Sequence, residues 1–226
     1  MIEIKNLHKS YKVGTNTKHI AQGVSLKIPL GSSVGIFGRN GAGKSTLLRM
    51  IAGLERADRG TITTTGSVSW PVGFAGSFHP DLTGAQNVKF VARLYGVDTG
   101  ELTEFVRNFA ELDIHFEAPF RTYSAGMKAR LGFGLSMGIY FGTYLIDEVA
   151  AVGDEAFRKK SSAYLKQRVK SSSAIIVSHS MGLLKDLCNC GIILINGHAK
   201  YYADIDEAIN VHKSAMVGQL PNWAIK

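Results

Sequence analysis

The chain has 226 residues, of which 45% are hydrophobic and 19% are charged, with 25 Gly and only 5 Pro. This composition excludes an intrinsically disordered chain, and the length predicts one packed domain, since domains typically have roughly 100 to 200 residues. Lys and Arg number 26 against 18 Asp and Glu, which gives a net charge of +8. The surplus favours an anionic partner (nucleotide, acidic lipid headgroups or nucleic acid) without choosing among them.

Several features argue against membrane spanning, secretion and zinc binding. The longest uncharged stretch, residues 131–146, falls short of the roughly 18 apolar residues of a membrane span. Residues 1–5 lack the basic and apolar regions of a secretory signal, so the chain is expected to remain in the cytosol. Cys188 and Cys190 have no second pair with which to form a zinc site and are expected to be reduced, structural thiols. The basic run at 158–160 falls in a predicted helix, where a solvated face is expected.

The N-terminal part is predicted to hold strands followed by a loop and a helix. Hydrophobic and polar residues alternate at the start of the chain and again over 24–28, which predicts two strands with one buried face. After a turn at 29–31, the apolar segment 33–37 predicts a short buried strand. A Gly-rich loop follows, and then a helix over 44–52 that ends at Gly53, a residue suited to the left-handed conformation.

A helical insert is predicted to separate this region from a second strand-rich region. Hydrophobic spacing becomes helical from about residue 82 to 140. Asp98 and Glu101 predict a helix N-terminus before the apolar stripe of Leu102, Phe105, Val106 and Phe109. Later elements are a strand at 144–147, a helix at about 155–170, a strand at 174–178, a further helix, and a hairpin whose Asn196-Gly197 dipeptide favours a type I′ turn.

Residues 38–45 match the P-loop pattern, in which two glycines separated by four residues precede Lys and Ser or Thr. Small residues allow successive backbone N–H groups to converge on phosphates, and the following helix adds the positive end of its dipole. Lys44 is expected to neutralise the β- and γ-phosphates, and the Ser45 hydroxyl to bind Mg²⁺. The strand before and the helix after disfavour a loop that is merely Gly-rich. The predicted ATP-binding residues here are Gly38, Arg39, Asn40, Gly41, Ala42, Gly43, Lys44, Ser45 and Thr46.

A pair of carboxylates, Asp147 and Glu148, ends an apolar strand about a hundred residues after the P-loop. Asp147 suits a water-mediated contact to Mg²⁺, and Glu148 can orient or deprotonate the attacking water. Alone, such a run is as often structural as functional, but its place after a P-loop favours catalysis. His179 follows the strand at 174–178, at the sheet edge where ligands bind in parallel α/β folds, and is expected to contact the γ-phosphate and hold the water with Glu148.

Two further candidates depend more on context. Ser124, Ala125 and Gly126 form a turn that opens a helix, and a Ser hydroxyl with a Gly N–H at a helix start can bind an anion. Without context the turn indicates only an N-capped helix. Tyr11 lies in a basic, polar stretch before the P-loop strand, where its ring can stack on adenine; a partly buried structural Tyr is the alternative.

Taken in order, these elements resemble the nucleotide-binding subunits of ABC transporters over almost the whole chain. The resemblance implies an α/β P-loop NTPase fold with a parallel core sheet, an N-terminal antiparallel β region and an α-helical subdomain inserted at about 79–140, within one ABC ATPase domain over 1–226. It implies ATP and Mg²⁺ as cofactors. It also implies a head-to-tail homodimer on ATP binding, in which the turn at 124–126 of one chain closes over ATP held by the other, and Asp154 is expected to act across the same interface. The helical subdomain is expected to contact a separate transmembrane permease subunit.

Longer strings are similar to the ATP-binding subunits of capsular polysaccharide exporters. This similarity implies that ATP hydrolysis energises export of a capsular polysaccharide, with the chain bound peripherally at the cytoplasmic face of the bacterial inner membrane. O-antigen exporters have an additional C-terminal sugar-binding domain, for which this chain is expected to be too short. The strings that carry the similarity lie at 69–71, 82–84, 90–95, 123–131 and 147–154.

The chain departs from the general family pattern in three places. Ala125 and Met127 replace a Gly and a Gln of the usual turn, and Ser77 stands where a Gln is expected. Residues 151–154 read Ala-Val-Gly-Asp in place of Ser-Ala-Leu-Asp. Closure of the dimer is therefore expected to differ in detail from that of the general family.

Three alternatives remain open on sequence alone. The first is the ATPase subunit of another polysaccharide or teichoic-acid-type exporter. The second is a soluble ABC-type ATPase that acts on nucleic acid, which the charge permits but which usually has two ATPase domains or a coiled-coil insert, so no nucleic-acid partner is expected. The third, a P-loop kinase, leaves the turn at Ser124 unexplained.

Overall fold

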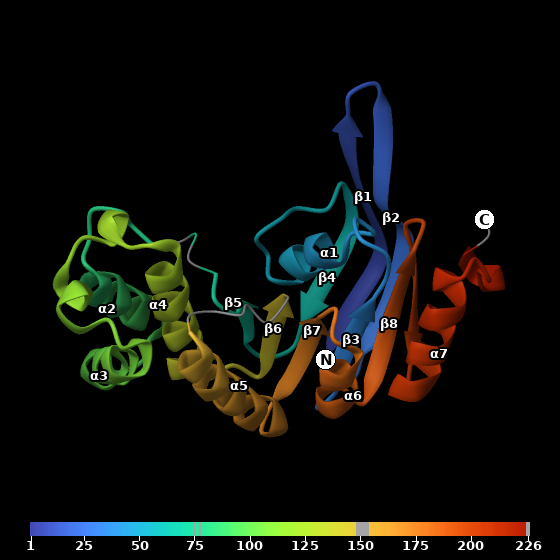
Figure 1. Ribbon diagram of the computed structural model, residues 1–226. Helices are drawn as coiled ribbons and strands as arrows, with labels where there is room; N and C mark the ends of the chain where they lie inside the picture. Colours follow the sequence, from blue (N-terminus) through green and yellow to red (C-terminus); the bar gives the residue numbers. More distant parts are fainter. Residues whose placement is uncertain (75, 77, 148–153, 225–226) are drawn as a thin grey trace. The chain divides into compact units, whose positions relative to one another are not determined.

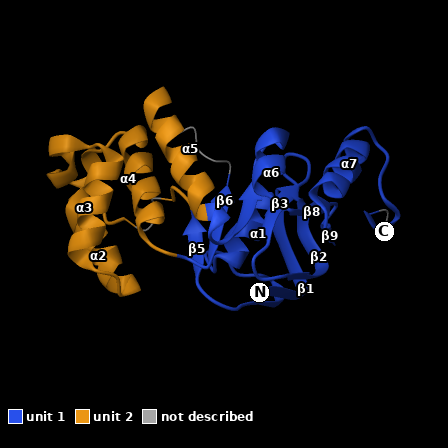
Figure 2. Ribbon diagram, turned by 90° about the horizontal axis from the view of Figure 1, so that it is seen from below, with its two compact units in different colours: residues 1–71, 141–149, 169–226 blue, residues 72–140, 150–168 orange. Residues whose placement is uncertain are grey.

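A computed structural model describes residues 1–74, 76, 78–147 and 154–224. The chain divides into two compact units (Figure 2). Unit 1 comprises residues 1–71, 141–149 and 169–226, and unit 2 comprises residues 72–140 and 150–168. Among the helices of the described ranges, none is both long and apolar enough to cross a membrane.

An antiparallel sheet opens unit 1. It contains β1 (Ile2–Val13), β2 (Asn16–Ile28) and β4 (Arg59–Thr64) in the order β2-β1-β4 (Figure 1). Ile2 and Ile4 pair with Ile28 and Leu26, and all four side chains are buried. The strands predicted from alternation are therefore confirmed, because each turns one apolar face toward the core.

The second sheet of unit 1 has six strands in the order β5-β6-β7-β3-β8-β9. Strands β5 through β8 pair in parallel, whereas β9 joins β8 as an antiparallel hairpin. Every residue of β3 and β7 is buried, as expected for inner strands that are covered on both faces. The bounds are β3 Ser33–Phe37, β5 Val68–Pro71, β6 Thr143–Asp147, β7 Ser173–Val177, β8 Cys190–Ile195 and β9 His198–Tyr202.

Three helices cover this second sheet. They are α1 (Lys44–Ile51), α6 (Met181–Leu187) and α7 (Ile205–Met216), and a 3-10 turn follows at Asn222–Ala224. Helix α1 packs against β5, β6 and β7, while α7 packs against β3, β8 and β9. Leu47 and Leu48 of α1 join residues of both sheets in one hydrophobic cluster. Gly53, with φ of +72°, follows the end of α1 as predicted.

Two local predictions in unit 1 are confirmed. Asn196 and Gly197 have φ of +50° and +78°, which are the positive angles that a type I′ turn requires between β8 and β9. Cys188 and Cys190 are both buried and not disulfide-bonded. Burial raises the pKa of Cys188 to about 12, so this thiol stays neutral.

Unit 2 is built from helices around an aromatic core. Its elements are α2 (Gly84–Tyr95), α3 (Thr99–Ala110), 3-10 turns at Asp113–Glu117 and Phe120–Thr122, α4 (Ala125–Gly138), and most of α5 (Glu155–Lys170). Phe109 lies at the centre, with ring contacts to Phe105, Phe133, Phe157 and Tyr164. These rings come from α3, α4 and α5, so the three helices share one core.

The helix starts of unit 2 follow capping chemistry. Asp98 caps α3 and accepts a hydrogen bond from the backbone N–H of Glu101, as predicted. At α2 the Thr83 hydroxyl accepts from the N–H of Gln86, and the Gln86 side chain accepts from the N–H of Thr83. This second pair is a complete capping box, which the sequence analysis did not identify.

The basic run at 158–160 is only partly a solvated face, so that prediction is wrong for one residue. Lys159 is exposed and pairs with Glu155 at 3.3 Å. Lys160, in contrast, donates to the carbonyl oxygens of Asn108 and Phe109 and pairs with Glu111 at 2.6 Å. The reason is that the last carbonyls of α3 lack partners within the helix, and a cation at this end also complements the helix dipole.

Candidate nucleotide-binding site

The loop between β3 and α1 presents backbone N–H groups without a competing side-chain cap. Gly43 is the N-cap of α1 with φ of +102°, and as a glycine it has no side chain with which to cap the first turn. A Cβ on Gly43 would lie 2.3 Å from Cγ2 of Ile20, so both conformation and space require glycine. The open N–H groups and the helix dipole therefore suit an anion such as phosphate.

Lys44 extends back over this loop. Its side-chain amine donates to the carbonyl oxygens of Gly38 at 2.9 Å and Arg39 at 3.2 Å. The residue is 9% exposed, and burial of the alkyl chain leaves the charged end at the loop. The amine is thus held where a phosphate bound by the loop would lie.

Ser45 and Asp147, which are 102 positions apart in sequence, meet in the structure. The Ser45 hydroxyl donates to Oδ1 of Asp147 at 3.0 Å. Parallel pairing brings β6, which Asp147 ends, into the same sheet as β3, which leads into the P-loop. A hydroxyl and a carboxylate oxygen are donors that Mg²⁺ prefers, so this pair fits the ion.

A pocket of about 530 Å³ collects most of the predicted residues of unit 1. Tyr11 and His179 line it together with the P-loop, although they come from opposite ends of the chain. His179 lies just beyond β7, at the carboxyl end of a central strand. The other lining residues are Val13, Lys18, Ile20, Asn40, Gly41, Gly43, Lys44, Ser45 and Thr46.

A second pocket of about 370 Å³ adjoins the same loop. Its lining includes Gly38, Arg39 and Ala42 of the P-loop, the turn at 194–197 and helix α7. His212 of α7 lies at 5.5 Å from Phe37, between ring centroids. Burial, and to a smaller extent the charge of Lys44, lowers the pKa of His212, so the imidazole is neutral at pH 7.

Tyr11 has polar partners that sequence reasoning missed. Its hydroxyl donates to Glu55, and the amine of Lys9 lies 5.0 Å from the centroid of its ring. No local pattern identifies Glu55, because it lies 44 positions after Tyr11 in the segment that follows α1. The contact arises only when β1 packs beside that segment.

Within unit 2, Ser124 is the N-cap of α4. Its hydroxyl accepts from the backbone N–H of Met127 at 3.2 Å, and Ala125 and Gly126 form the first turn. A Cβ on Gly126 would find the Ser124 hydroxyl as its nearest neighbour, at 3.9 Å, so this turn is open on the surface of the unit. An open first turn has N–H groups available to an anion.

Asp154 is bound within unit 2. One carboxylate oxygen accepts from the N–H of Phe157 at 2.9 Å, and the other accepts from Arg130 at 2.7 Å. The hydrogen bond from Phe157, and then the charge of Arg130, lower the pKa of Asp154. The residue therefore caps the start of α5 and joins it to α4. Glu148, the predicted catalytic base, and Ser77 lie outside the described residues.

The comparisons with known proteins agree on one family. A family model described as "ABC transporter" matches residues 21–151. The chain is 49% identical over 216 residues to the polysialic acid transport ATP-binding protein KpsT of Escherichia coli, covering 94% of this chain and 96% of the relative. It is 42% identical to the ATP-binding protein BexA of Haemophilus influenzae, covering 92% of this chain and 96% of the relative. It is 41% identical to the capsule polysaccharide export ATP-binding protein CtrD of Neisseria meningitidis serogroup B, covering 95% of this chain and 99% of the relative.

A solved structure supports the fold. A dimeric post-hydrolysis form of the ATP-binding cassette MJ0796, bound to ADP and Pi, superposes with a TM-score of 0.73 at 21% identity and covers 91% of this chain and 99% of that one. The predicted fold, a parallel core sheet with an N-terminal antiparallel region, is thus confirmed. The chain belongs to the ABC transporter family, as one of its ATP-binding and ATP-hydrolysing cassettes.

Proposed function

We propose that this chain is the ATPase subunit that energises export of a capsular polysaccharide across the bacterial inner membrane, bound peripherally at the cytoplasmic face. The observation that supports ATP use is the pocket lined by the P-loop and His179, in which Ser45 also donates a hydrogen bond to Asp147. The cargo is inferred from relatives 41–49% identical over more than nine-tenths of the chain, whose names specify polysialic acid transport or capsule polysaccharide export.

In this proposal the residues of unit 1 hold and orient the nucleotide. The loop N–H groups and Lys44 bind the β- and γ-phosphates, and Tyr11 stacks on the base. Ser45 and Asp147 hold Mg²⁺, which supplies charge neutralisation at the phosphates. Glu148 deprotonates or orients the attacking water, and His179 holds that water beside the γ-phosphate.

A second copy of the chain completes the site. The open turn at 124–126 caps the triphosphate held by the other protomer in a head-to-tail dimer, and Asp154 borders the same interface. Support comes from the exposed first turn of α4 and from the dimeric form in which a cassette of this fold has been solved. Hydrolysis then removes the bridging γ-phosphate and lets the dimer open.

The whole chain, 1–226, forms one ABC ATPase domain in this proposal, and the helical insert at 79–140 contacts a separate permease. Large apolar side chains are exposed on α2, namely Phe90, Leu94 and Tyr95, at 56%, 69% and 45%. Clustered exposed apolar residues of this kind are typical of protein-binding surfaces. A membrane subunit is therefore expected to copurify with the chain in detergent.

The test uses a bacterial strain that carries this protein, with the chromosomal gene deleted. We expect the deletion to remove polysaccharide from the cell surface and the wild-type chain to restore it, whereas Lys44→Ala fails because nucleotide affinity is lost. Lys166→Ala, which removes an exposed lysine of α5 outside the pocket, serves as the matched control and restores export. Normal surface polysaccharide in the deletion strain, with nucleic acid copurifying in place of a membrane subunit, would instead favour the nucleic-acid ATPase.

A further inference from the structure

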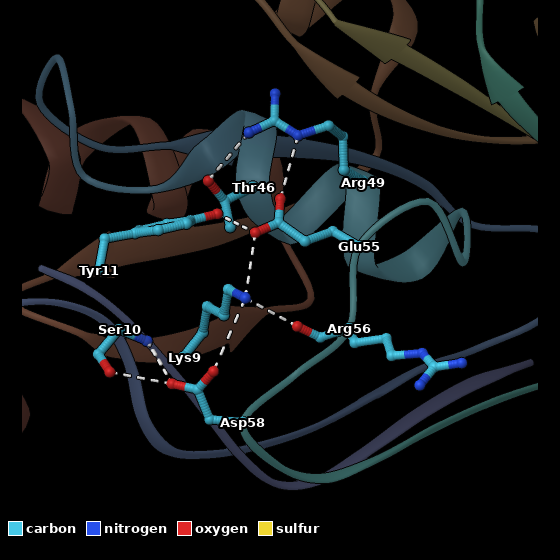
Figure 3. Close-up of polar contacts among 8 residues, drawn as sticks. All are labelled: Lys9, Ser10, Tyr11, Thr46, Arg49, Glu55, Arg56 and Asp58. Carbon is cyan, nitrogen blue, oxygen red and sulfur yellow. Dashed lines mark hydrogen bonds and ion pairs between the residues drawn. The ribbon is translucent and has the colours of Figure 1, made fainter.

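A network of polar contacts surrounds Glu55 beside the nucleotide pocket (Figure 3). One carboxylate oxygen accepts from the Tyr11 hydroxyl and lies 3.2 Å from the amine of Lys9. The other oxygen lies 3.2 Å from Nε of Arg49. The Glu55 side chain is only 18% exposed, so these contacts replace most of the water around the charge.

The network reaches the P-loop helix. Arg49 also donates from its guanidinium to the Thr46 hydroxyl at 3.3 Å. Thr46 lies in the first turn of α1, directly after Ser45, and lines the nucleotide pocket. Glu55 therefore connects β1, which carries Tyr11, to the helix that begins at the phosphate-binding loop.

Lys9 covers one face of the Tyr11 ring. Its amine lies 5.0 Å from the ring centroid, a cation–π distance, and its side chain is 13% exposed. The same amine donates to the carbonyl oxygen of Arg56 at 2.9 Å and lies 3.7 Å from Asp58, so it is held in place (Figure 3). Because Lys9 covers one face, only the other face of Tyr11 can accept a flat aromatic group.

Asp58 fixes the backbone beside Tyr11. A single carboxylate oxygen accepts from the backbone N–H of Ser10 at 2.7 Å and from its hydroxyl at 2.9 Å. The strand is thereby tied to the segment after α1 directly before Tyr11. These backbone contacts do not fix the orientation of the Tyr11 ring. The hydrogen bond from the Tyr11 hydroxyl to Glu55 does.

We propose that Glu55 is a positioning residue for the nucleotide base. It holds the Tyr11 ring through the phenol hydroxyl, with one face covered by Lys9 and the other face presented to the base. The proposal rests on the function proposed above, in which Tyr11 stacks on the base. The competing interpretation is a purely structural cluster that joins β1 to the segment after α1.

The charge state of Glu55 fits this role. Burial by itself raises the pKa of Glu55, but the hydrogen bonds from Tyr11, Lys9 and Arg49 outweigh it and lower the pKa. The carboxylate is thus ionised at neutral pH and can only accept hydrogen bonds, so the Tyr11 hydroxyl must donate to it. This hydrogen bond fixes the position of the Tyr11 hydroxyl, and therefore the orientation of the ring.

The test compares two ligands by titration calorimetry on the full chain, namely ATP and inorganic tripolyphosphate. Glu55→Ala and Tyr11→Phe should each weaken ATP binding about three- to tenfold, the range that loss of one hydrogen bond corresponds to. Tripolyphosphate has no base, so its affinity should stay within about twofold. In ATPase assays of these two variants, KM for ATP should rise by about the factor by which ATP affinity falls. The kcat at saturating ATP should be unchanged.

Two further variants separate positioning from general destabilisation. Glu55→Gln keeps an oxygen that accepts from Tyr11 and should recover most of the ATP affinity. The double variant Tyr11→Phe with Glu55→Ala should be no weaker than Glu55→Ala alone, because both changes break the same bond. An additive loss would overturn the proposal.

Glu3→Ala is the matched control. Glu3 lies on the same strand, is 15% exposed, and pairs with Lys5 at 2.9 Å and Lys27 at 3.0 Å, but it does not line the pocket. The affinities of Glu3→Ala for ATP and for tripolyphosphate should both equal those of the wild-type chain. If Glu55→Ala weakens both ligands equally, or neither, while Tyr11→Ala weakens ATP alone, the inference fails and the proposed function stands. If Tyr11→Ala also leaves ATP binding intact, the base contact in the proposed function itself is wrong.

Discussion

Ser45 and Lys44 are neighbours in sequence but direct their side chains to different partners. The amine of Lys44 returns to the carbonyl oxygens of the loop, whereas the hydroxyl of Ser45 reaches Asp147 on β6. This divergence follows from the helix, in which successive residues point about 100° apart. One residue can therefore serve the phosphates while the next serves the metal.

We predict that Ser45→Ala raises the Mg²⁺ concentration needed for half-maximal ATPase activity several-fold. The reason is that the variant removes one oxygen donor and leaves Asp147 as the protein's remaining contact at this point. Magnesium titrations at fixed ATP measure the shift, with Ser162→Ala on α5 as a control that leaves the curve unchanged. An unaltered magnesium curve in Ser45→Ala would exclude Ser45 from metal binding.

For Glu148 we predict that Glu148→Gln keeps ATP binding and slows turnover about a hundredfold or more, because the amide cannot accept a proton from the attacking water. Steady-state phosphate release and equilibrium ATP binding, measured on the same preparation, separate the two effects. Turnover at the wild-type rate would remove Glu148 from the role of general base.

Cys188 offers a prediction about pH. Burial raises its pKa to about 12 from an ordinary value of 9.0, so the folded protein keeps the thiol protonated where the unfolded chain ionises. The contribution of this thiol to stability is therefore complete below about pH 9 and is lost as the pH rises toward about 12. At pH 8.5 we expect a thiol reagent to leave Cys188 unmodified until denaturant is added, as mass spectrometry of the labelled peptide would show. Rapid labelling of the native protein would contradict the burial described here.

At the scale of elements, unit 2 depends on how its helix ends are satisfied. The Thr83–Gln86 capping box begins α2, Asp98 begins α3, and Lys160 of α5 binds the last carbonyls of α3. Each contact satisfies backbone groups that lack partners within the helix. Helix α4, which begins with the turn at 124–126, packs against α3, so the stability of these helices determines how well that turn is held.

Thr83→Ala should lower the free energy of unfolding by about 1 kcal/mol, the usual cost of losing an N-cap side chain. ATP affinity should remain unchanged, because Thr83 belongs to unit 2 and does not line the nucleotide pocket. Urea denaturation followed by circular dichroism measures the first quantity. Thr17→Ala, at an exposed position on β2, is the control that should change stability by less than half as much. Equal effects of the two substitutions would show that the capping box contributes nothing special.

At the scale of the whole molecule, the nucleotide is expected to control association. In the proposed dimer, the P-loop that binds triphosphate on one protomer and the open helix start at Ser124 on the other form complementary halves only when the γ-phosphate is present. Association of this kind is linked to ligand binding, so any condition that preserves ATP should also preserve the dimer.

We predict that Glu148→Gln is monomeric without nucleotide and dimeric with ATP and Mg²⁺, as light scattering coupled to size-exclusion chromatography would show. Ser124→Arg should block the dimer by placing bulk at the turn while leaving ATP binding to the single chain intact. A Glu148→Gln chain that stays monomeric with ATP would refute the head-to-tail arrangement.

Much of the fold could be predicted because the relevant signals are local. The alternation at Ile2 and Ile4, the apolar run at 33–37 and the Asn196-Gly197 turn each specify an element within a few residues. The P-loop was equally visible, since its glycines and Lys44 act through a contiguous backbone. Lys160 shows where this reasoning stops: its role depends on the end of α3, about fifty positions earlier in the chain.

The sequence by itself determined most of the strands and helices, the phosphate loop and the family, because periodicity, turn chemistry and contiguous motifs are properties of short segments. It did not predict strands β4 and β5. Only the tertiary structure decided which distant side chains meet, namely Ser45 with Asp147, Tyr11 with Glu55, and Asp154 with Arg130. The physical reason is that such contacts depend on which strands pair and on how helices pack against one another. The pattern within a single segment does not indicate which strand it pairs with or which helix it packs against.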